Sequence, residues 1–535
     1  MYRFRLCWFY GRIIFLEENY RVGIDVDTLK ASYDALMKKA KAVIILQSTE
    51  DIMNWDMETK MPRKGIILRS EQLAMLSGIE HRMSTDRQIG DLLEKIVGHP
   101  DYATLDVIRR RNMYLIRKRY DEQTKLPEKL VTETAKQRAI TIETWKKAKA
   151  AQDFALYKPE LVRLLDLRKQ AADILMEVKE SPTPYDALID IYEPNITSKM
   201  IAAIFNRLKT GLIAIIDKCQ TSKTQPDTSF LRRRVPISIQ RNISKSLASF
   251  IGYDVESERA GGRIDETEHP FTTGYYDDVR ITTHYYEDTL TSSIFSVLHE
   301  SGHAIYEQNL NPDWMYQPIG SDCSMGIHES QSRFVENVIG RSREFWSYFL
   351  PKLKKATGTI FSDVDLDEFV FAINQVTPSK IRTESDEVTY CLHIIIRFEI
   401  EDGLMRDKIS VTDLPEVWSQ KYRDYLGVEV ENDSEGVMQD THWAGGLIGY
   451  FPTYALGNIY SGQLLAPMQR ELPDWKRQIA AGDFHQVKRW LVENIHRHGN
   501  LYNPADLITK VTSEGINIQP YLNYLTEKYS MLYDF

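Results

Sequence analysis

Two histidines four residues apart, His299 and His303, have the spacing that best suits metal chemistry in this chain. On an α-helix such residues lie one above the other on one face, so both imidazoles can bind one Zn²⁺ ion. Glu300 lies one step round the helix, where a carboxylate can accept a proton from water activated by the ion. The pattern predicts a hydrolytic metal site, with chance histidines on a surface helix as the alternative.

The residues around this pair predict a buried helix over 296–308, because apolar residues flank the histidines and Gly302 allows a close neighbour. Glu307 lies one turn past His303 and can orient a ligand imidazole. On the next predicted helix, 327–341, Glu329 would complete a set of two histidines and one glutamate that leaves a coordination position open. Glu336 competes for that role, and Glu329 could instead cap its helix.

Overall composition limits the classes of protein to consider. The 535 residues carry a net charge of −9, which argues against a nucleic-acid-binding protein held by phosphate contacts. The hydrophobic content of 43% is enough for a large core. The four cysteines, Cys7, Cys219, Cys323 and Cys391, are far apart and form no CxxC pair. We therefore expect neither a disulfide framework nor a cysteine zinc site. We expect a cytoplasmic location.

Residues 1–24 differ from the rest of the chain in being aromatic, basic and apolar. Their apolar runs are too short and too often interrupted by charge to span a bilayer, and a small-residue cleavage site is missing. We expect an amino-terminal extension of doubtful role, followed by a single domain over 25–535. No association with membranes is expected.

Apolar periodicity predicts helices through most of the chain. Pro127 and Pro159 are expected in first turns, 54–62 is expected to be irregular with Trp55 as a core anchor, and 380–386 is expected to open a long helix. The segment 269–286 alternates β-branched and polar residues and predicts a β-hairpin beside the metal helix. The early predicted helices are 70–97, 105–120, 127–150, 159–178 and 199–219.

Seven blocks occur in the order found in one known family. Together they make the chain resemble peptidase family M32, the thermostable carboxypeptidase Taq group of metallocarboxypeptidases, over about residues 25–530. Ser385 departs from the family, which often has alanine there. The blocks are WDMETKMP (55–62), HPF (269–271), DVRIT (278–282), HESGH (299–303), HESQ (328–331), IRTESD (381–386) and GVMQDTHW (436–443).

The resemblance implies a mainly α fold, with a large two-lobed helical body, a deep central groove and a small β-hairpin or sheet beside the metal site. This architecture is similar to that of neurolysin and angiotensin-converting enzymes. It also implies one divalent ion per chain, Zn²⁺ or Co²⁺, bound by His299, His303 and Glu329, with Glu300 as general base and acid. Family members are generally homodimers, so a homodimer is expected.

The function implied is hydrolysis of the C-terminal peptide bond of peptides, with broad specificity. One alternative is an endo-oligopeptidase or peptidyl-dipeptidase with the same metal site. Another is a non-catalytic helical metal-binding protein. The open coordination position and Glu300 weigh against the latter, because structural zinc sites are normally closed by four protein ligands.

A carboxypeptidase must bind a free α-carboxylate, which the planar fork of arginine fits. Arg382 is the first choice and Arg280 the second. Arg382 could instead pair with Asp386, which otherwise supports the site from behind, and Arg280 could pair with Asp278.

The oxyanion of a tetrahedral intermediate needs a hydrogen-bond donor. His442 and Tyr450 are placed like the donors of neurolysin-like peptidases. Tyr454 is the alternative donor and is expected among the substrate-binding residues. For Tyr450, the alternative role is core packing. Gln439 and Asp440 could bind substrate or hold the His442 ring. His269 is expected to be a structural turn residue rather than a substrate contact.

Overall fold

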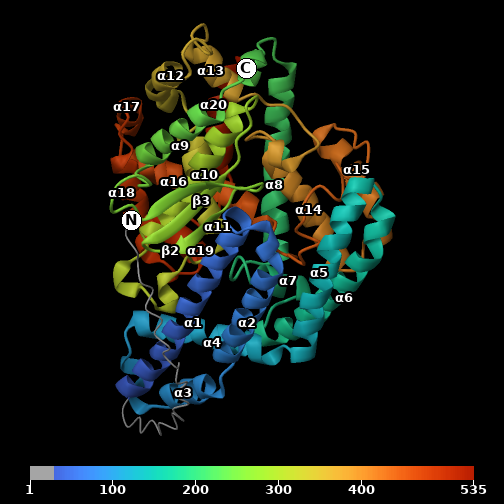
Figure 1. The fold of residues 1–535 in the computed structure, drawn as a ribbon, viewed down its shortest axis with the longest axis vertical. Helices are drawn as coiled ribbons and strands as arrows, with labels where there is room; N and C mark the ends of the chain where they lie inside the picture. Colours follow the sequence, from blue (N-terminus) through green and yellow to red (C-terminus); the bar gives the residue numbers. More distant parts are fainter. Residues whose placement is uncertain (1–28) are drawn as a thin grey trace, which may run out of the picture.

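The structure is a computed structural model that describes residues 29–535. The expected extension over 1–24, with Cys7, and the domain start near residue 25 lie outside the described residues. Helices dominate the described part, and three short strands form one sheet beside α10 (Figure 1). The expected fold class, mainly α with a small sheet, is confirmed.

Nine helices precede the sheet in the described part of the chain. They are α1 (Leu29–Thr59), α2 (Ile66–Ser84), α3 (Arg87–Val97), α4 (Val107–Lys125), α5 (Glu128–Ala151), α6 (Phe154–Lys179), α7 (Pro184–Ile189), α8 (Ser198–Thr221) and α9 (Ile237–Ile251). Eleven more follow it within residues 290–535. They are α10 (Leu290–Gln308), α11 (Met325–Arg333), α12 (Arg343–Thr357), α13 (Leu366–Ile373), α14 (Tyr390–Met405), α15 (Leu414–Leu426), α16 (Pro452–Glu471), α17 (Trp475–Ala480), α18 (His485–Asn494), α19 (Pro504–Thr512) and α20 (Gln519–Tyr533).

The sheet contains the expected hairpin. Strands β2 (Thr272–Tyr275) and β3 (Asp278–Thr283) are antiparallel, and β1 (Gly262–Glu266) adds in parallel to the other side of β3. Val279 and Ile281 of β3 are fully buried, and β3 packs on α10. The sequence did not indicate β1, because Gly262–Glu266 carries one large apolar residue and no hydrophobic alternation.

Three local expectations were wrong, and capping explains two of them. The helix expected over 70–97 breaks at Asp86, whose carboxylate accepts a hydrogen bond from Gln88 N at 2.9 Å and starts α3. Pro159 lies inside α6 rather than in its first turn, because Asp153 caps that helix earlier. The segment expected to be irregular from residue 54 continues α1 to Thr59.

Two other expectations near the site have mixed outcomes. Trp55 is 5% exposed, which confirms the expected core anchor, and the Arg280 guanidinium lies 4.2 Å from its ring centroid. The segment 380–386 does not open a regular helix, since α14 begins only at Tyr390. Asp386 accepts hydrogen bonds from the backbone N–H groups of Val388 and Thr389, and these hold a turn before the helix.

Two hydrophobic clusters divide the described residues. The larger runs from Ala148 to Tyr533 and includes the sheet and α10. The smaller joins α1, α3 and α4 through residues such as Leu36, Leu93 and Met113. Figure 1 shows α1 to α4 together at the lower end of the molecule, with α5, α6, α14 and α15 at its side.

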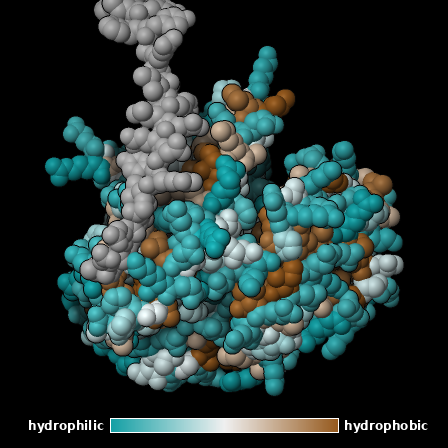
Figure 2. Space-filling model, turned by 90° about the horizontal axis from the view of Figure 1, so that it is seen from below, coloured by the Kyte–Doolittle hydropathy of each residue, from teal (hydrophilic) through white to brown (hydrophobic). Residues whose placement is uncertain are grey.

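The face seen in Figure 2 is mostly hydrophilic, with hydrophobic side chains gathered in patches. Among the described residues, no helix is both long enough and apolar enough to cross a membrane.

Candidate metal centre

Helices α10 and α11 bring three side chains of the expected types together. The Nε2 atoms of His299 and His303 lie 3.6 and 3.5 Å from Oε2 of Glu329. All three ligand atoms lie within 4.8 Å of one another. Tetrahedral zinc with bonds of about 2.1 Å separates its ligand atoms by about 3.4 Å. The donor set therefore fits a single divalent ion with little adjustment.

Two glycines allow the helices that carry these ligands to pack closely. A Cβ atom on Gly302 of α10 would lie 2.7 Å from the backbone of Gln331 and Ser332. A Cβ atom on Gly457 of α16 would lie 2.5 Å from Cγ of Glu329. Both contacts are too short for any side chain, so the ligand spacing depends on glycine at these positions.

Arg333 contacts the Glu329 carboxylate and helps to keep it ionised. Arg333 Nε donates to Glu329 Oε1 at 2.7 Å, which leaves Oε2 facing the histidines. Burial opposes ionisation, but Arg333 and the two imidazoles hold the pKa of Glu329 well below its ordinary value. A negative ligand is thus present at any pH at which the imidazoles are neutral.

Each ligand imidazole has a different partner at Nδ1. His299 Nδ1 lies 2.9 Å from Glu336 Oε2, so Glu336 supports His299 from behind while Glu329 faces the ligands. Glu336 lies in a π-helical turn, Phe334–Ile339, that continues α11, and such turns are frequent at functional sites. Although burial opposes ionisation, Arg333 holds the pKa of Glu336 down to about 2.

His303 reaches the carboxylate of Glu307 through a second imidazole. His303 Nδ1 lies 2.5 Å from His328 Nδ1, and His328 Nε2 lies 2.9 Å from Glu307 Oε1. If His303 binds metal through Nε2, its Nδ1–H donates to His328, which in turn donates from Nε2 to Glu307. Glu307 therefore acts on the ligand indirectly. Burial, followed by the nearby His328, lowers the pKa of His303 to about 3, which keeps its imidazole neutral.

Glu300 is held in place by the edge strand of the sheet. The Thr272 hydroxyl of β2 donates to Glu300 Oε2 at 2.6 Å. Burial raises the pKa of Glu300 above its ordinary value, as expected for a general base that must also return a proton. The adjacent strand thus fixes the carboxylate beside the histidine pair.

The expected oxyanion donors form an aromatic cluster. His442 Nε2 lies 3.4 Å from the Tyr454 hydroxyl, and the Tyr450 ring stacks on His442 at 5.8 Å between centroids. Burial lowers the pKa of His442 to about 3 and raises that of Tyr450 to about 12, so both are neutral near pH 7. The charge of Glu329 acts on Tyr450 and Tyr454, which places the cluster near the metal ligands.

Arg382 lies beside this cluster and is 8% exposed. Its Nε and Nη2 atoms donate to both oxygens of Asp440, at 3.1 and 2.8 Å. Its partner is thus Asp440 rather than Asp386. The backbone N–H of Arg382 donates to Gln439 Oε1 at 2.9 Å, so Gln439 holds the loop in place.

The remaining expected residues lie further from the ligands or have other partners. Arg280 makes two hydrogen bonds of 2.7 Å with Asp278, the alternative pairing expected from the sequence. Asp386 accepts from the backbone N–H groups of Val388 and Thr389, just before α14, and of Thr377; none of these hydrogen bonds reaches a candidate metal ligand. His269 is exposed in a bend before β2, and its charge acts on His442.

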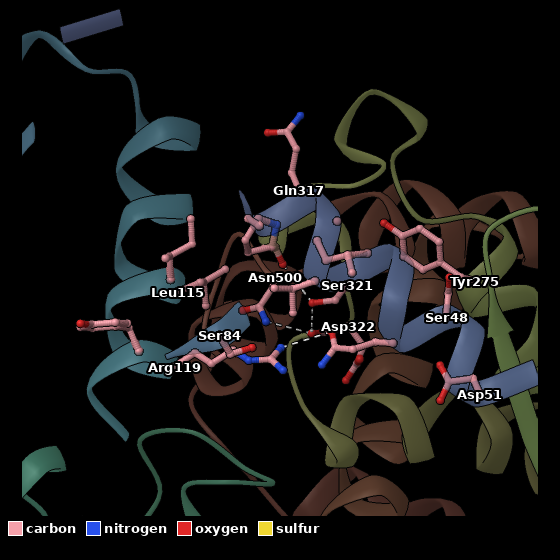
Figure 3. A pocket seen from close by; sticks show the side chains of 18 of the residues that line it. Ser48, Asp51, Ser84, Leu115, Arg119, Tyr275, Gln317, Ser321, Asp322 and Asn500 are labelled. Carbon is pink, nitrogen blue, oxygen red and sulfur yellow. Dashed lines mark hydrogen bonds between the residues drawn. The ribbon is translucent and has the colours of Figure 1, made fainter. Parts of the chain in front are cut away.

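A pocket of about 390 Å³ lies between the N-terminal helices and the segments around Tyr275 and residues 317–322 (Figure 3). Tyr275 of β2 and Glu307 of α10 line one side, and Leu115 and Arg119 of α4 line the other. Because Glu307 is the residue bonded to His328, the pocket adjoins the support of the ligand His303. The pocket's lining does not include the three ligands themselves.

Sequence reasoning missed the partners that position the site. Thr272, Arg333 and His328 each contact a ligand or Glu300, yet none was assigned a role. Arg333 could have been found by helical spacing, since it lies four residues past Glu329 on the same face of α11. His328 lies one residue before Glu329 and contacts His303 of α10, so helical spacing does not indicate it. Thr272 gives no such signal, because its contact depends on how β2 docks on α10.

A mainly helical body with two histidines and a glutamate around a common point, and a buried carboxylate beside them, defines a metal-dependent hydrolase. Residues 35–529 match the family model described as carboxypeptidase Taq (M32) metallopeptidase. The chain belongs to this family.

Relatives agree with this assignment over almost the whole chain. The chain is 40% identical to thermostable carboxypeptidase 1 of Thermus thermophilus, covering 95% of this chain and 100% of that protein. It is also 40% identical to carboxypeptidase 1 of Bacillus subtilis, covering 90% and 95%. The solved M32 carboxypeptidase of Deinococcus radiodurans is similar with a TM-score of 0.90 and 33% identity, covering 94% and 100%.

The expected resemblance and activity class are thus confirmed. The chain is a metallocarboxypeptidase, its family implies a divalent metal and peptide substrates, and neither an endopeptidase nor a non-catalytic protein is favoured.

Proposed function

We propose that His299, His303 and Glu329 hold one Zn²⁺ or Co²⁺ ion in a site of the HExxH type. The enzyme uses this ion to release the C-terminal residues of peptides, with broad specificity for the residue released. The observation that carries this proposal is the 3.5 and 3.6 Å spacing of the two Nε2 atoms from Glu329 Oε2. When bound, the ion polarises the scissile carbonyl and lowers the pKa of water.

Glu300 is the general base and acid. Its carboxylate takes the proton of the attacking water and returns it to the leaving amine. The hydrogen bond from Thr272 and the raised pKa support this role, because the first fixes the carboxylate and the second helps it hold the proton between the two steps.

His442 and Tyr450 donate hydrogen bonds to the developing oxyanion, with Tyr454 adjoining them in the substrate-binding wall. Their neutral states near pH 7 leave each with a proton to donate. His442 Nδ1 is buried and has no hydrogen-bond partner within residues 29–535.

Arg382 binds the α-carboxylate of the peptide. Asp440 and Gln439 fix its side chain and backbone, while the outer end of its guanidinium stays available. Arg280 is the second substrate-binding arginine, and its pair with Asp278 makes it the weaker of the two.

Glu307 supports His303 through His328, and Asp386 orders the start of α14.

We also propose one domain over 25–535 with two helical lobes around a central groove, a homodimer, and a cytoplasmic location. The free, buried state of Cys219, Cys323 and Cys391 supports a reducing compartment.

Product analysis tests the proposed reaction. An amino-terminally acetylated peptide should lose one residue at a time from its carboxyl end. Mass spectrometry of the products measures this. The same peptide with a C-terminal amide should remain uncut, because Arg382 then has no carboxylate to bind. Release of dipeptides, or cleavage of the amide, would contradict the proposal.

A further inference from the structure

Arg397 of α14 is a buried cation that the mechanism above leaves unused. The residue is 0% exposed, and none of its three guanidinium nitrogens has a hydrogen-bond acceptor among residues 29–535. The rings of Trp443 and Phe451 lie 3.9 and 4.2 Å from it, which stabilises the cation in part. Burying a charge without hydrogen bonds is costly, so this arrangement needs a reason.

Two carboxylates lie near Arg397, and one of them is fully occupied elsewhere. Glu401 Oε1 is 4.0 Å from Arg397 Nε, and it accepts from Trp443 Nε1 at 2.7 Å. Its other oxygen accepts from the Tyr185 hydroxyl and from Gly449 N. Asp440 Oδ2 is closer, 3.5 Å from Arg397 Nη1, and it is the carboxylate that Arg382 also binds.

Asp440 therefore lies between two arginines and engages only one edge of Arg382. Arginine has five N–H groups. Asp440 accepts from the one on Nε and from one on Nη2, and the Tyr390 hydroxyl accepts from one on Nη1 at 3.3 Å. One N–H on Nη1 and one on Nη2 remain without an acceptor. This pair matches a second carboxylate in the bidentate manner.

A single guanidinium that holds two carboxylates carries an excess negative charge unless another cation balances it. We propose that Arg397 is this cation: it pairs electrostatically with Asp440 and so lets Arg382 bind the α-carboxylate of the peptide. Arg382, Arg397 and Asp440 together have a net charge of +1, which one substrate carboxylate neutralises. The inference rests on the proposed role of Arg382 and makes Arg397 a positioning residue that determines carboxylate affinity.

Charge-balanced variants of the metal-loaded enzyme test the inference. Arg397→Met lowers the charge of the three-residue set to zero, and KM for an acetylated peptide with a free carboxyl end should rise about 30-fold. The value of kcat should change less than about threefold, because the lost attraction is the same in ground and transition states. Adding Asp440→Asn restores the charge of +1, and the double variant should recover most of the lost KM.

If Arg397 had a purely structural role, the double variant would not recover KM, because removing two buried charged groups would destabilise the protein further. If KM of Arg397→Met is unchanged, or if the double variant is worse than the single one, the inference fails. Should Arg397→Met not fold, Arg397→Gln and Arg397→Lys give the same comparison, with KM raised by the neutral residue and restored by the cationic one.

Two controls separate this failure from failure of the proposed function. Arg382→Met must raise KM, and an unchanged KM there would overturn both the role of Arg382 and the present inference. Arg406→Met removes a cation paired with Asp402 at the end of the same helix, at 2.7 Å, and KM should stay at the wild-type value. A raised KM in Arg406→Met would show that any lost cation weakens binding, which also contradicts the inference.

Discussion

The two candidate ligand histidines are supported by different kinds of group. His299 contacts the carboxylate of Glu336, whereas His303 contacts the imidazole ring of His328. Both partners fix the ring and tautomer, so that Nε2 points at the common centre. The metal affinity therefore depends on residues that do not themselves face the ion.

Replacement of His328 tests this dependence. His328→Ala should lower metal affinity about 10- to 100-fold, because the His303 ring loses its acceptor and its link to Glu307. Competition with a chelator measures the change. His498→Ala, which removes a ring packed on Tyr502, is the control and should bind metal as the wild type does. Equal affinity in both variants would contradict the account.

The edge strand holds Glu300 through one hydroxyl, and we expect this contact to matter for turnover. Thr272→Val should lower kcat about tenfold, the rate equivalent of one buried hydrogen bond, because Glu300 loses the donor that fixes it. Metal content should not change. Thr273→Val alters the neighbouring residue of the same strand and should retain wild-type turnover. A similar loss in both variants would show that the effect comes from the strand and not from the hydroxyl.

At the scale of elements, the site depends on how closely α16 approaches α11. Gly457→Ala places a methyl group 2.5 Å from Cγ of Glu329, and we expect a loss of about 1–3 kcal/mol in the free energy of unfolding together with weaker metal binding. Gly515→Ala is the matched control, since a Cβ atom there meets nothing within 4 Å. Denaturant unfolding compares the two. An unaffected Gly457→Ala protein would show that the helices can separate without cost.

A titratable group, Glu193, packs against the start of α11, and its effect on stability has a definite sign. Glu193 is fully buried and accepts hydrogen bonds from Gly326 N and the Tyr460 hydroxyl, at 3.0 and 2.9 Å. Burial raises the pKa of Glu193 from 4.5 to about 7. The folded state therefore binds this proton more tightly than the unfolded chain does, and stability contributed by Glu193 falls as pH rises between those two values.

Glu193→Gln should remove that dependence. Between pH 4.5 and 7 the free energy of unfolding of the wild type should fall by on the order of 3 kcal/mol relative to that of the variant. Above pH 7 the difference between the two free energies should stay constant. Unfolding free energies of both proteins at pH 5 and pH 8 measure it. Parallel pH profiles would contradict a raised pKa at this position.

For the whole molecule, the ion joins two helices of the main core and should stabilise the fold by binding only the folded state. Removing metal with a chelator should lower the unfolding temperature, and the shift should grow with the concentration of metal restored. Glu329→Gln should abolish most of this shift, because the ligand set then lacks its negative member. Calorimetry with and without metal measures the effect; an unchanged shift in the variant would contradict the ligand assignment.

The parts of the fold that the sequence predicted are those set by local pattern. Alternation in 278–282 identified the hairpin, and the spacing of His299 and His303 identified the metal helix, because both signals depend on residues near one another. Contacts between distant segments carried no such signal. The pairing of Arg382 with Asp440, and the position of Arg397 beside them, depend on a loop that returns to α14.

Turnover by metal-loaded Glu300→Gln enzyme shows whether Glu300 moves the proton in the proposed hydrolysis. Glutamine keeps the size of the side chain and removes its ability to take a proton. We expect the variant to retain its ion and to lose at least about 100-fold in kcat on an acetylated peptide. A fully loaded variant with wild-type turnover would remove Glu300 from the chemistry and contradict the account.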